Sequence, residues 1–264
     1  MAFGFRCCRY LSESNQPILA VKGLKKSFGG VAAVDSVSFE VQRGTLTGLI
    51  GPNGSGKSTL FNLIAGTLKP DSGNVYFEGE NIDKLPPDRR FHLGMVRTFQ
   101  DPRLFFGMNV FENMLVPPSL QRGEGPTAGI FPFRWKNQEL ELGQRAKSVM
   151  ADLKIDSVAR NNSAEISGGQ MKLLQLGQTL MNLPKLVLLD EPTAGVAPAL
   201  TQSIFEKINE LRNRHGITFL IIEHKLQALF KFVDYVQVMH RGKIFVAGKP
   251  GEIMINPELG DIYL

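Results

Sequence analysis

One glycine-rich run, with a short apolar strand before it and an amphipathic helix after it, restricts the possible folds of this chain most. Thr45–Ile50 has the pattern of the strand, and Leu60, Phe61 and Ile64 recur at helical spacing after Lys57. Closely spaced glycines let successive backbone N–H groups curl around an anion, and the start of a helix adds positive potential there. The sequence therefore predicts a phosphate-binding loop. Its residues are Gly51, Pro52, Asn53, Gly54, Ser55, Gly56, Lys57, Ser58 and Thr59.

The polar side chains of this loop each have a chemical task. The ammonium of Lys57 would reach the β- and γ-phosphates of ATP, and the hydroxyl of Ser58 would ligate Mg²⁺. A chance match to this pattern is expected in roughly 1% of chains of this length, given the usual frequency of glycine. The flanking strand and helix lower that chance further.

Two adjacent carboxylates, Asp190 and Glu191, follow a second apolar run at Leu186–Leu189. Acids after a strand most often form a solvated turn, but downstream of a phosphate-binding loop the functional interpretation is favoured. Because side chains alternate along a strand, the two carboxylates are predicted to face opposite sides. Asp190 would then face Mg²⁺, and Glu191 would face the water that attacks the γ-phosphate.

The pattern along the chain predicts an α/β fold. Alternating residues near Leu19 and at Val37–Val41, with Val75–Phe77, indicate a small antiparallel layer. After residue 183 apolar strands and helices alternate, which is typical of a parallel sheet covered by helices. The predicted elements there are the strand Leu186–Leu189, a helix over Pro198–Arg214 and the strand Thr218–Ile222.

Residues 101–183 are predicted to form an α-helical subdomain inserted in this core. Asn109 and Glu112 form a capping pair at the start of one helix, and Leu142–Leu153 carries the apolar spacing of another. Pro117–Trp135, rich in glycine and proline, is expected to be a surface excursion. Residues 1–17 are expected to be a loose tail on a single domain spanning 18–264.

The amino-acid composition excludes several classes of protein. With 43% hydrophobic and 21% charged residues, the chain is globular rather than disordered. Its net charge of +5 favours an anionic partner, but basic residues never run longer than pairs, which argues against a nucleic-acid-binding arm. No apolar run approaches the roughly 20 residues of a spanning helix. Cys7 and Cys8 are neighbours, which suits neither a disulfide framework nor a zinc site.

A third motif, Ile166-Ser167-Gly168-Gly169-Gln170, lies between the loop and the acids. Ser167 and Gln170 fit a helix capping box, and alone that explanation would be favoured. In this position, however, the motif is similar to the Leu-Ser-Gly-Gly-Gln signature of ABC transporter ATPases. The resemblance covers nearly all of 18–264 and implies the P-loop NTPase fold of that family. It also implies that Ser167, Gly168, Gly169 and Gln170 contact the γ-phosphate held by a second subunit.

The resemblance implies roles for three further residues. Gln100 occupies the place of the glutamine that reaches Mg²⁺ or the attacking water, and His224 matches the switch histidine at the γ-phosphate. Phe28 matches, more loosely, the aromatic residue that stacks on adenine. Glu191 would be the general base. Ala197 departs from the family because it stands where Asp or Asn is usual, which puts coupling between two ATP sites in doubt, and Gln178 replaces a common arginine.

Finer motifs resemble the ATPases of branched-chain or neutral amino-acid importers. They are Arg97–Phe105, Val110–Asn113, Asn256-Pro257 and Ile262–Leu264. The resemblance implies a peripheral subunit at the cytoplasmic face of a membrane. Its partners would be a second ATPase subunit, of the same or a sister chain, transmembrane permease subunits and, indirectly, a solute-binding protein. No nucleic-acid partner is expected.

Several alternatives stay open at this point. Related ATPases of urea or amide import and of lipopolysaccharide export share much of the pattern. A soluble ABC ATPase acting on DNA or ribosomes is disfavoured, because the gap between Gln100 and Ser167 is too short for a long coiled coil and only one cassette is present. A nucleotide-binding module without hydrolysis is disfavoured by the presence of both Glu191 and His224.

Overall fold

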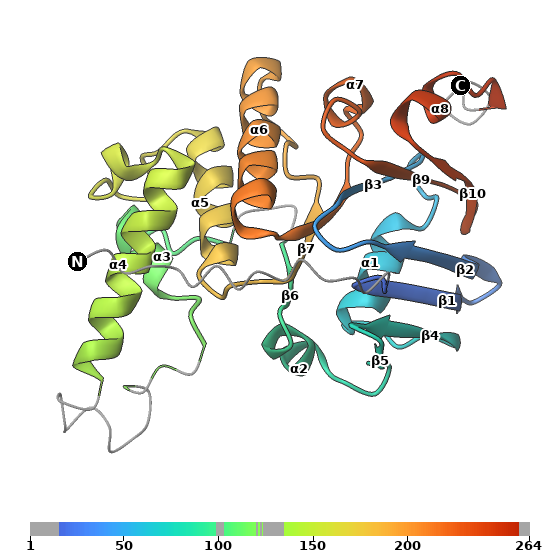
Figure 1. Ribbon diagram of the computed structural model, residues 1–264, viewed down its shortest axis with the longest axis horizontal. Coiled ribbons are helices and arrows are strands. Elements are labelled where there is room, and N and C mark those ends of the chain that lie inside the picture. Colours follow the sequence, from blue (N-terminus) through green and yellow to red (C-terminus); the bar gives the residue numbers. More distant parts are fainter. Residues whose placement is uncertain (1–15, 99–102, 120, 122, 124–134, 259–264) are drawn as a thin grey trace.

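The computed structural model describes residues 16–98, 103–119, 121, 123 and 135–258. Two sheets organise this part of the chain (Figure 1). The first is antiparallel, in the order β2-β1-β4-β5. Its strands are β1 (Leu19–Phe28), β2 (Val31–Val41), β4 (Ser72–Phe77) and β5 (Glu80–Asn81).

The second sheet has six strands in the order β10-β9-β3-β8-β7-β6. All of its pairings are parallel except that of β9 with the edge strand β10. Its strands are β3 (Leu46–Ile50), β6 (Met95–Arg97), β7 (Leu186–Asp190), β8 (Thr218–Ile222), β9 (Tyr235–His240) and β10 (Lys243–Gly248). Every residue of β3, β7 and β8 is buried, as expected for strands covered on both faces.

The helices cover both faces of the six-stranded sheet. On one face, α1 lies between the two sheets, and its residues Leu60 and Phe61 share a core with Leu188 of β7. On the other face, residues of α3 to α6 share a core with Val187 and Leu189. The helices are α1 (Lys57–Ala65), α2 (Pro87–His92), α3 (Val110–Leu115), α4 (Lys136–Leu153), α5 (Gly168–Leu180), α6 (Pro198–His215), α7 (Leu226–Leu229) and α8 (Pro250–Met254), with a 3₁₀ turn at Asp156–Val158.

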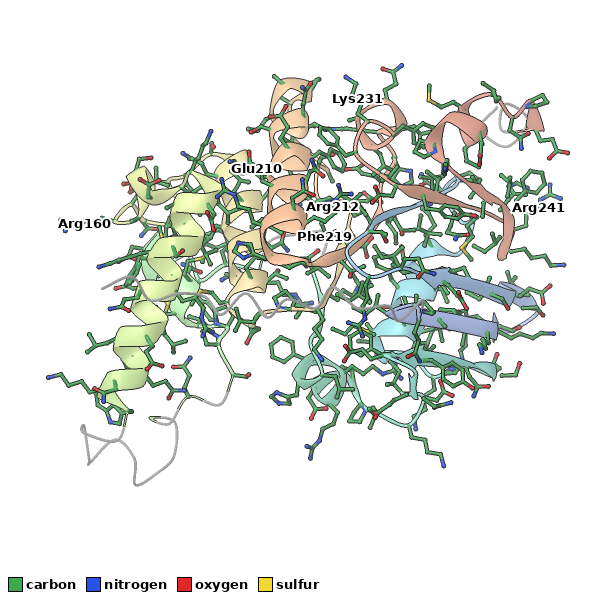
Figure 2. All side chains as sticks on the ribbon, viewed as in Figure 1. Arg160, Glu210, Arg212, Phe219, Lys231 and Arg241 are labelled. Carbon is green, nitrogen blue, oxygen red and sulfur yellow. The ribbon has the colours of Figure 1, made fainter. Side chains whose placement is uncertain are left out.

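The helix-rich part between β6 and β7 contains α3, α4 and α5, which lie together at the end of the molecule away from the antiparallel sheet (Figure 1). The predicted capping pair is confirmed, since Asn109 accepts from the Glu112 N–H and Glu112 accepts from the Asn109 N–H. Phe219 of β8 is fully buried in the sheet beneath α6 (Figure 2). The predicted α/β class is therefore confirmed.

A buried arginine ties α2 to the end of α1. Arg90 donates to the carbonyl oxygens of Leu63 and Ile64 at 3.0 and 2.6 Å, where α1 ends. The last carbonyls of a helix have no partner within the helix, so this guanidinium caps them. It thereby holds α1, which carries the phosphate-binding loop at its other end, in a fixed place.

Within the described ranges, no helix combines the length and the apolar character that crossing a bilayer requires. The tail with Cys7 and Cys8, and the motif Ile262–Leu264, lie outside the described residues. So does most of Pro117–Trp135.

Candidate functional site

The glycine-rich loop connects β3 to α1 as predicted. Gly51, Gly54 and Gly56 have φ angles of 151°, 77° and 104°, which residues other than glycine rarely adopt. A Cβ atom at Gly51 would lie 2.1 Å from the carbonyl oxygen of Met239, and one at Gly56 would lie 2.1 Å from that of Ala33. Backbone on both sides therefore leaves room for glycine only, and the loop keeps its curled shape.

Lys57 is the first residue of α1, and its side chain folds back into the loop. Its ammonium donates to the carbonyl oxygens of Gly51 and Pro52 at 2.8 and 2.9 Å. Burial lowers the pKa of Lys57, and the nearby carboxylates of Glu191 and Asp190 oppose that effect. Among the described residues, the hydrogen-bond acceptors of this buried cation are two neutral carbonyls, which makes the loop receptive to an anion.

Asp190 ends β7 and forms an ion pair that the sequence analysis did not foresee. Arg97, at the end of the neighbouring strand β6, donates to the Asp190 carboxylate at 3.0 Å, and each side chain is 12% exposed. The same guanidinium donates to Asn62 of α1 at 2.6 Å. Arg97 therefore joins Asp190 at the end of β7 to α1, the helix that follows the phosphate-binding loop. Only the parallel pairing of β6 with β7 brings these residues together, so no local pattern could have found them.

Glu191 and His224 lie together just beyond the carboxyl ends of β7 and β8. Glu191 Oε1 lies 3.0 Å from His224 Nε2, although 33 positions separate them in the chain. The residues follow β7 and β8, which are adjacent and parallel, so their carboxyl ends lie side by side. The structure thus brings together a carboxylate and a histidine that the sequence analysis had assigned to separate roles.

The expected reason for the divergence of the two acids is wrong. The strand ends at Asp190, and Glu191 has a left-handed φ of 48°, so strand alternation does not extend to it. The Glu191 N–H still donates to the Ile222 carbonyl of the neighbouring strand at 3.0 Å, and the backbone turns at this residue. The turn, rather than the pleat, sends Glu191 to His224 and leaves Asp190 with Arg97. Positive φ at a non-glycine residue is a strained conformation that is found preferentially at functional sites.

Ser167 caps the start of α5. Gln170 N–H donates to its hydroxyl at 3.3 Å, and the Gln170 side chain accepts from the Ser167 N–H at 2.9 Å. Ser167 and Gly168 are exposed, whereas Gly169 packs so closely that a Cβ there would lie 1.9 Å from a methyl of Leu200. α5 packs on the sheet face opposite to α1. The helices that begin at the motif Ser167–Gln170 and at the phosphate-binding loop therefore cover opposite faces of the sheet.

The remaining predicted site residues are placed as follows. Phe28 ends β1 with half of its surface exposed, and the Lys26 ammonium lies 5.8 Å from the ring centre. Gln100 lies outside the described residues. Ala197 provides no side-chain hydrogen bond at the start of α6, where Asp or Asn would commonly do so. Gln178 donates to the Asn113 carbonyl at 3.0 Å and thereby joins α5 to α3.

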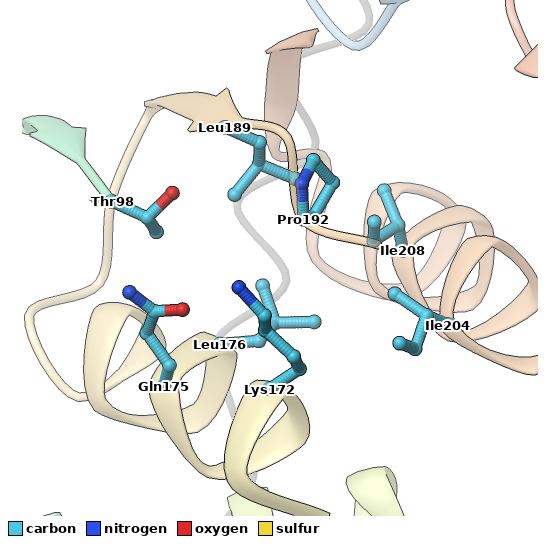
Figure 3. A pocket seen from close by; sticks show the side chains of 8 residues that line it. All are labelled: Thr98, Lys172, Gln175, Leu176, Leu189, Pro192, Ile204 and Ile208. Atoms are coloured by element: carbon cyan, nitrogen blue, oxygen red, sulfur yellow. The ribbon is translucent and has the colours of Figure 1, made fainter. Parts of the chain in front are cut away.

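A small cavity lies next to this region, between α5, α6 and β7. Figure 3 shows the Lys172 and Gln175 side chains extending toward Thr98 and Leu189. Its volume of about 10 Å³ accommodates roughly one water molecule. It is therefore too small for a nucleotide, and the phosphate-binding loop remains the candidate site.

Comparisons with known proteins agree with this geometry. The sequence pattern of the family described as "ABC transporter" matches residues 34–194. The chain is 42% identical over 251 residues to the probable branched-chain amino acid transport ATP-binding protein LivG of Methanocaldococcus jannaschii, covering 94% of this chain and 97% of that protein. It is 35% identical to the high-affinity LivG protein of Salmonella typhimurium, with 95% and 98% covered.

Solved structures give the same picture. A nucleotide-free ATP-binding cassette from an ABC transporter has 41% sequence identity and a TM-score of 0.82, and the match covers 94% of this chain and 99% of that one. The ADP conformation of an ATP-binding cassette matches with 41% identity and a TM-score of 0.83, covering 94% and 98%.

Proposed function

This chain belongs to the ABC transporter family, and from that premise we propose that it is the ATP-hydrolysing subunit of an importer for branched-chain or other neutral amino acids. The observation that carries the proposal is the contact of Glu191 with His224 at 3.0 Å, made at the edge where Lys57 and Asp190 also converge. Similarity to two proteins named for branched-chain amino acid transport supports the substrate class.

In the proposed mechanism, the loop from Gly51 to Thr59 binds the phosphates of ATP through backbone N–H groups, and Lys57 exchanges its two carbonyl acceptors for phosphate oxygens. Glu191 accepts the proton of the attacking water. His224 holds the Glu191 carboxylate in place through the observed contact and lies near the γ-phosphate. Phe28 offers an exposed ring on which adenine stacks.

The residues present also fit Mg²⁺. Ser58 and Asp190 supply a hydroxyl and a carboxylate oxygen, and Gln100 would add an amide oxygen; such hard oxygen donors suit this cation when phosphates and water complete its shell. Mg²⁺, when bound, would neutralise charge on the phosphate oxygens. Asp190 keeps one oxygen on Arg97, so its other oxygen is the one available to the cation or its water.

A second ATPase subunit is part of the proposal. Ser167, Gly168, Gly169 and Gln170 would bind the γ-phosphate held by the loop of a partner. Their place at the start of α5, where Ser167 and Gly168 are exposed, supports this role. Transmembrane permease subunits would form the path at the membrane, with this chain peripheral on its cytoplasmic side and a solute-binding protein acting beyond them. Residues 18–264 would be one ATPase domain with a helical subdomain at about 101–183, preceded by a tail at 1–17.

The test is to purify the full-length chain from membranes of its own host and to identify the proteins that accompany it. The proposal predicts integral membrane proteins in the complex, and ATP-dependent uptake of labelled leucine or alanine after reconstitution. The Lys57→Ala complex should assemble but lose both ATP binding and uptake. Recovery with ribosomes or DNA and without membrane proteins would contradict the proposal.

A further inference from the structure

Two charged residues are the chain neighbours of His224, Glu223 before it and Lys225 after it. Both contact the turn that follows Glu191, and neither has a role in the mechanism described above. The turn consists of residues 193–197 and leads from Glu191 into α6. The contacts bring together the ends of β7 and β8, which carry the two groups of the proposed catalytic pair.

Glu223 is 2% exposed, and its carboxylate is fully used. One oxygen accepts from the N–H and the hydroxyl of Thr193. The other accepts from the N–H groups of His224 and Lys225 at 2.8 and 3.1 Å. A buried carboxylate is stable only when donors compensate its lost hydration, and here the donors belong to the two segments that must stay together.

Lys225 holds the same turn from its other end. Its ammonium donates to the carbonyl oxygens of Thr193 at 3.0 Å and Val196 at 2.7 Å, and to the hydroxyl of Thr201 at 3.0 Å. All three donors of the ammonium are therefore engaged. A cation beside the start of α6 is unfavourable for the helix dipole, so these three contacts must compensate that cost. No acidic residue occupies the first turn of α6, and Ala197 gives it no side-chain cap.

We infer that Lys225, together with Glu223, is a positioning residue that fastens the 193–197 turn to His224 and so sets the distance between Glu191 and His224. Glu191 lies two residues before this turn, and its carbonyl accepts from the Ala194 N–H of the turn at 3.1 Å. Release of Thr193 and Val196 would therefore free the backbone directly after the proposed base. The inference rests on the proposed function, because it concerns the geometry of ATP hydrolysis.

The consequence is a separation of turnover from binding. The nucleotide is held by the glycine-rich loop on β3 and α1, which Lys225 does not contact. Loss of its ammonium should leave nucleotide affinity intact and reduce the chemical step, since misplacing a catalytic group by about 1 Å can cost on the order of 100-fold in rate.

The experiment compares Lys225→Met with Lys231→Met in the full-length chain. Both lysines line the same open groove between α6 and α7, of about 440 Å³, but Lys231 lies two residues beyond the end of α7 and is exposed (Figure 2). For Lys225→Met we expect kcat to fall roughly 10- to 100-fold while the KM for ATP changes by less than about twofold. Lys231→Met should match the unsubstituted chain in both.

A second variant separates positioning from a general loss of structure. Thr201→Val removes one acceptor of the ammonium; alone it should lower kcat by a smaller factor, and in the Lys225→Met background it should add little. Equal kcat for Lys225→Met and Lys231→Met would overturn the inference, and so would a parallel loss of kcat and nucleotide affinity. If the unsubstituted chain hydrolysed no ATP, the proposed function itself would fail, which is a different result from equal rates in active variants.

Discussion

Lys57 is a charged residue that the fold buries at the proposed phosphate site. Among the described residues, only carbonyl oxygens lie within hydrogen-bond distance of its ammonium. Burial lowers its pKa from the ordinary lysine value of 10.5. Phosphate oxygens would stabilise the charged form, so the pKa of Lys57 should rise again when a nucleotide binds. The bound state then holds the proton more tightly than the free state.

This difference predicts a pH dependence with a definite sign. Because the pKa is higher in the complex, nucleotide binding takes up protons in alkaline solution, and affinity falls as the pH rises through the lowered pKa of the free chain. Calorimetry of ADP binding in two alkaline buffers with different ionisation enthalpies measures the uptake. Lys57→Arg, whose guanidinium stays charged, should take up no protons. Equal heats in both buffers for the unsubstituted chain would contradict the expectation.

Arg97 is the residue whose importance depends most on long-range pairing. Its ion pair with Asp190 is largely shielded from water, and a shielded charge left without its partner is costly. Arg97→Met should lower the free energy of unfolding by roughly 2–4 kcal/mol in a urea titration. The control is Arg43→Met, which breaks a far more exposed pair with Glu78 and should cost less than about 1 kcal/mol. Equal losses in the two variants would show that burial does not strengthen the Arg97 pair.

The helix α6 illustrates what a local pattern can predict. The sequence predicts this helix from Pro198 at its first position and from the apolar spacing that follows. In the structure, both ends of α6 lie within one residue of the predicted range. Its weak point is also visible in sequence, because Ala197 has no atom with which to cap it. Glu191 shows the opposite case. It has a left-handed φ although its N–H still bonds to Ile222 of the neighbouring strand, and no neighbouring residue in the sequence signals that conformation.

The missing cap gives a prediction for α6. Ala197 has extended backbone angles of −61° and 150°, which suit a capping side chain. Ala197→Asp should therefore stabilise the chain by about 1 kcal/mol, equivalent to roughly 2–4 °C in thermal unfolding for a domain of this size. Ala197→Val, which adds a side chain without an acceptor, should bring no such gain. An unchanged or lower midpoint for the Asp variant would show that a side-chain acceptor at this position does not stabilise α6.

At the level of the whole molecule, two sheets and two cores divide the tasks. The core with α1 supports the phosphate-binding loop, and the core with α3 to α6 supports the motif Ser167–Gln170. Both motifs could be predicted from sequence, because each combines a helix start with small or capping residues. The packing of α1 and α5 on opposite faces of the sheet could not, since it depends on contacts between residues far apart in the chain.

The most direct test of this account measures two properties of the full-length Glu191→Gln variant. Light scattering reports its ATP-dependent dimerisation, and phosphate release reports its ATP turnover. The substitution removes the proposed base and leaves the loop and Ser167–Gln170 intact. ATP should convert this variant to a stable dimer with bound ATP and little turnover, whereas Glu206→Gln, at an exposed position of α6, should behave like the unsubstituted chain. A monomer at saturating ATP, or phosphate release near the unsubstituted rate, would contradict the central claim that Glu191 drives hydrolysis in a closed pair of subunits.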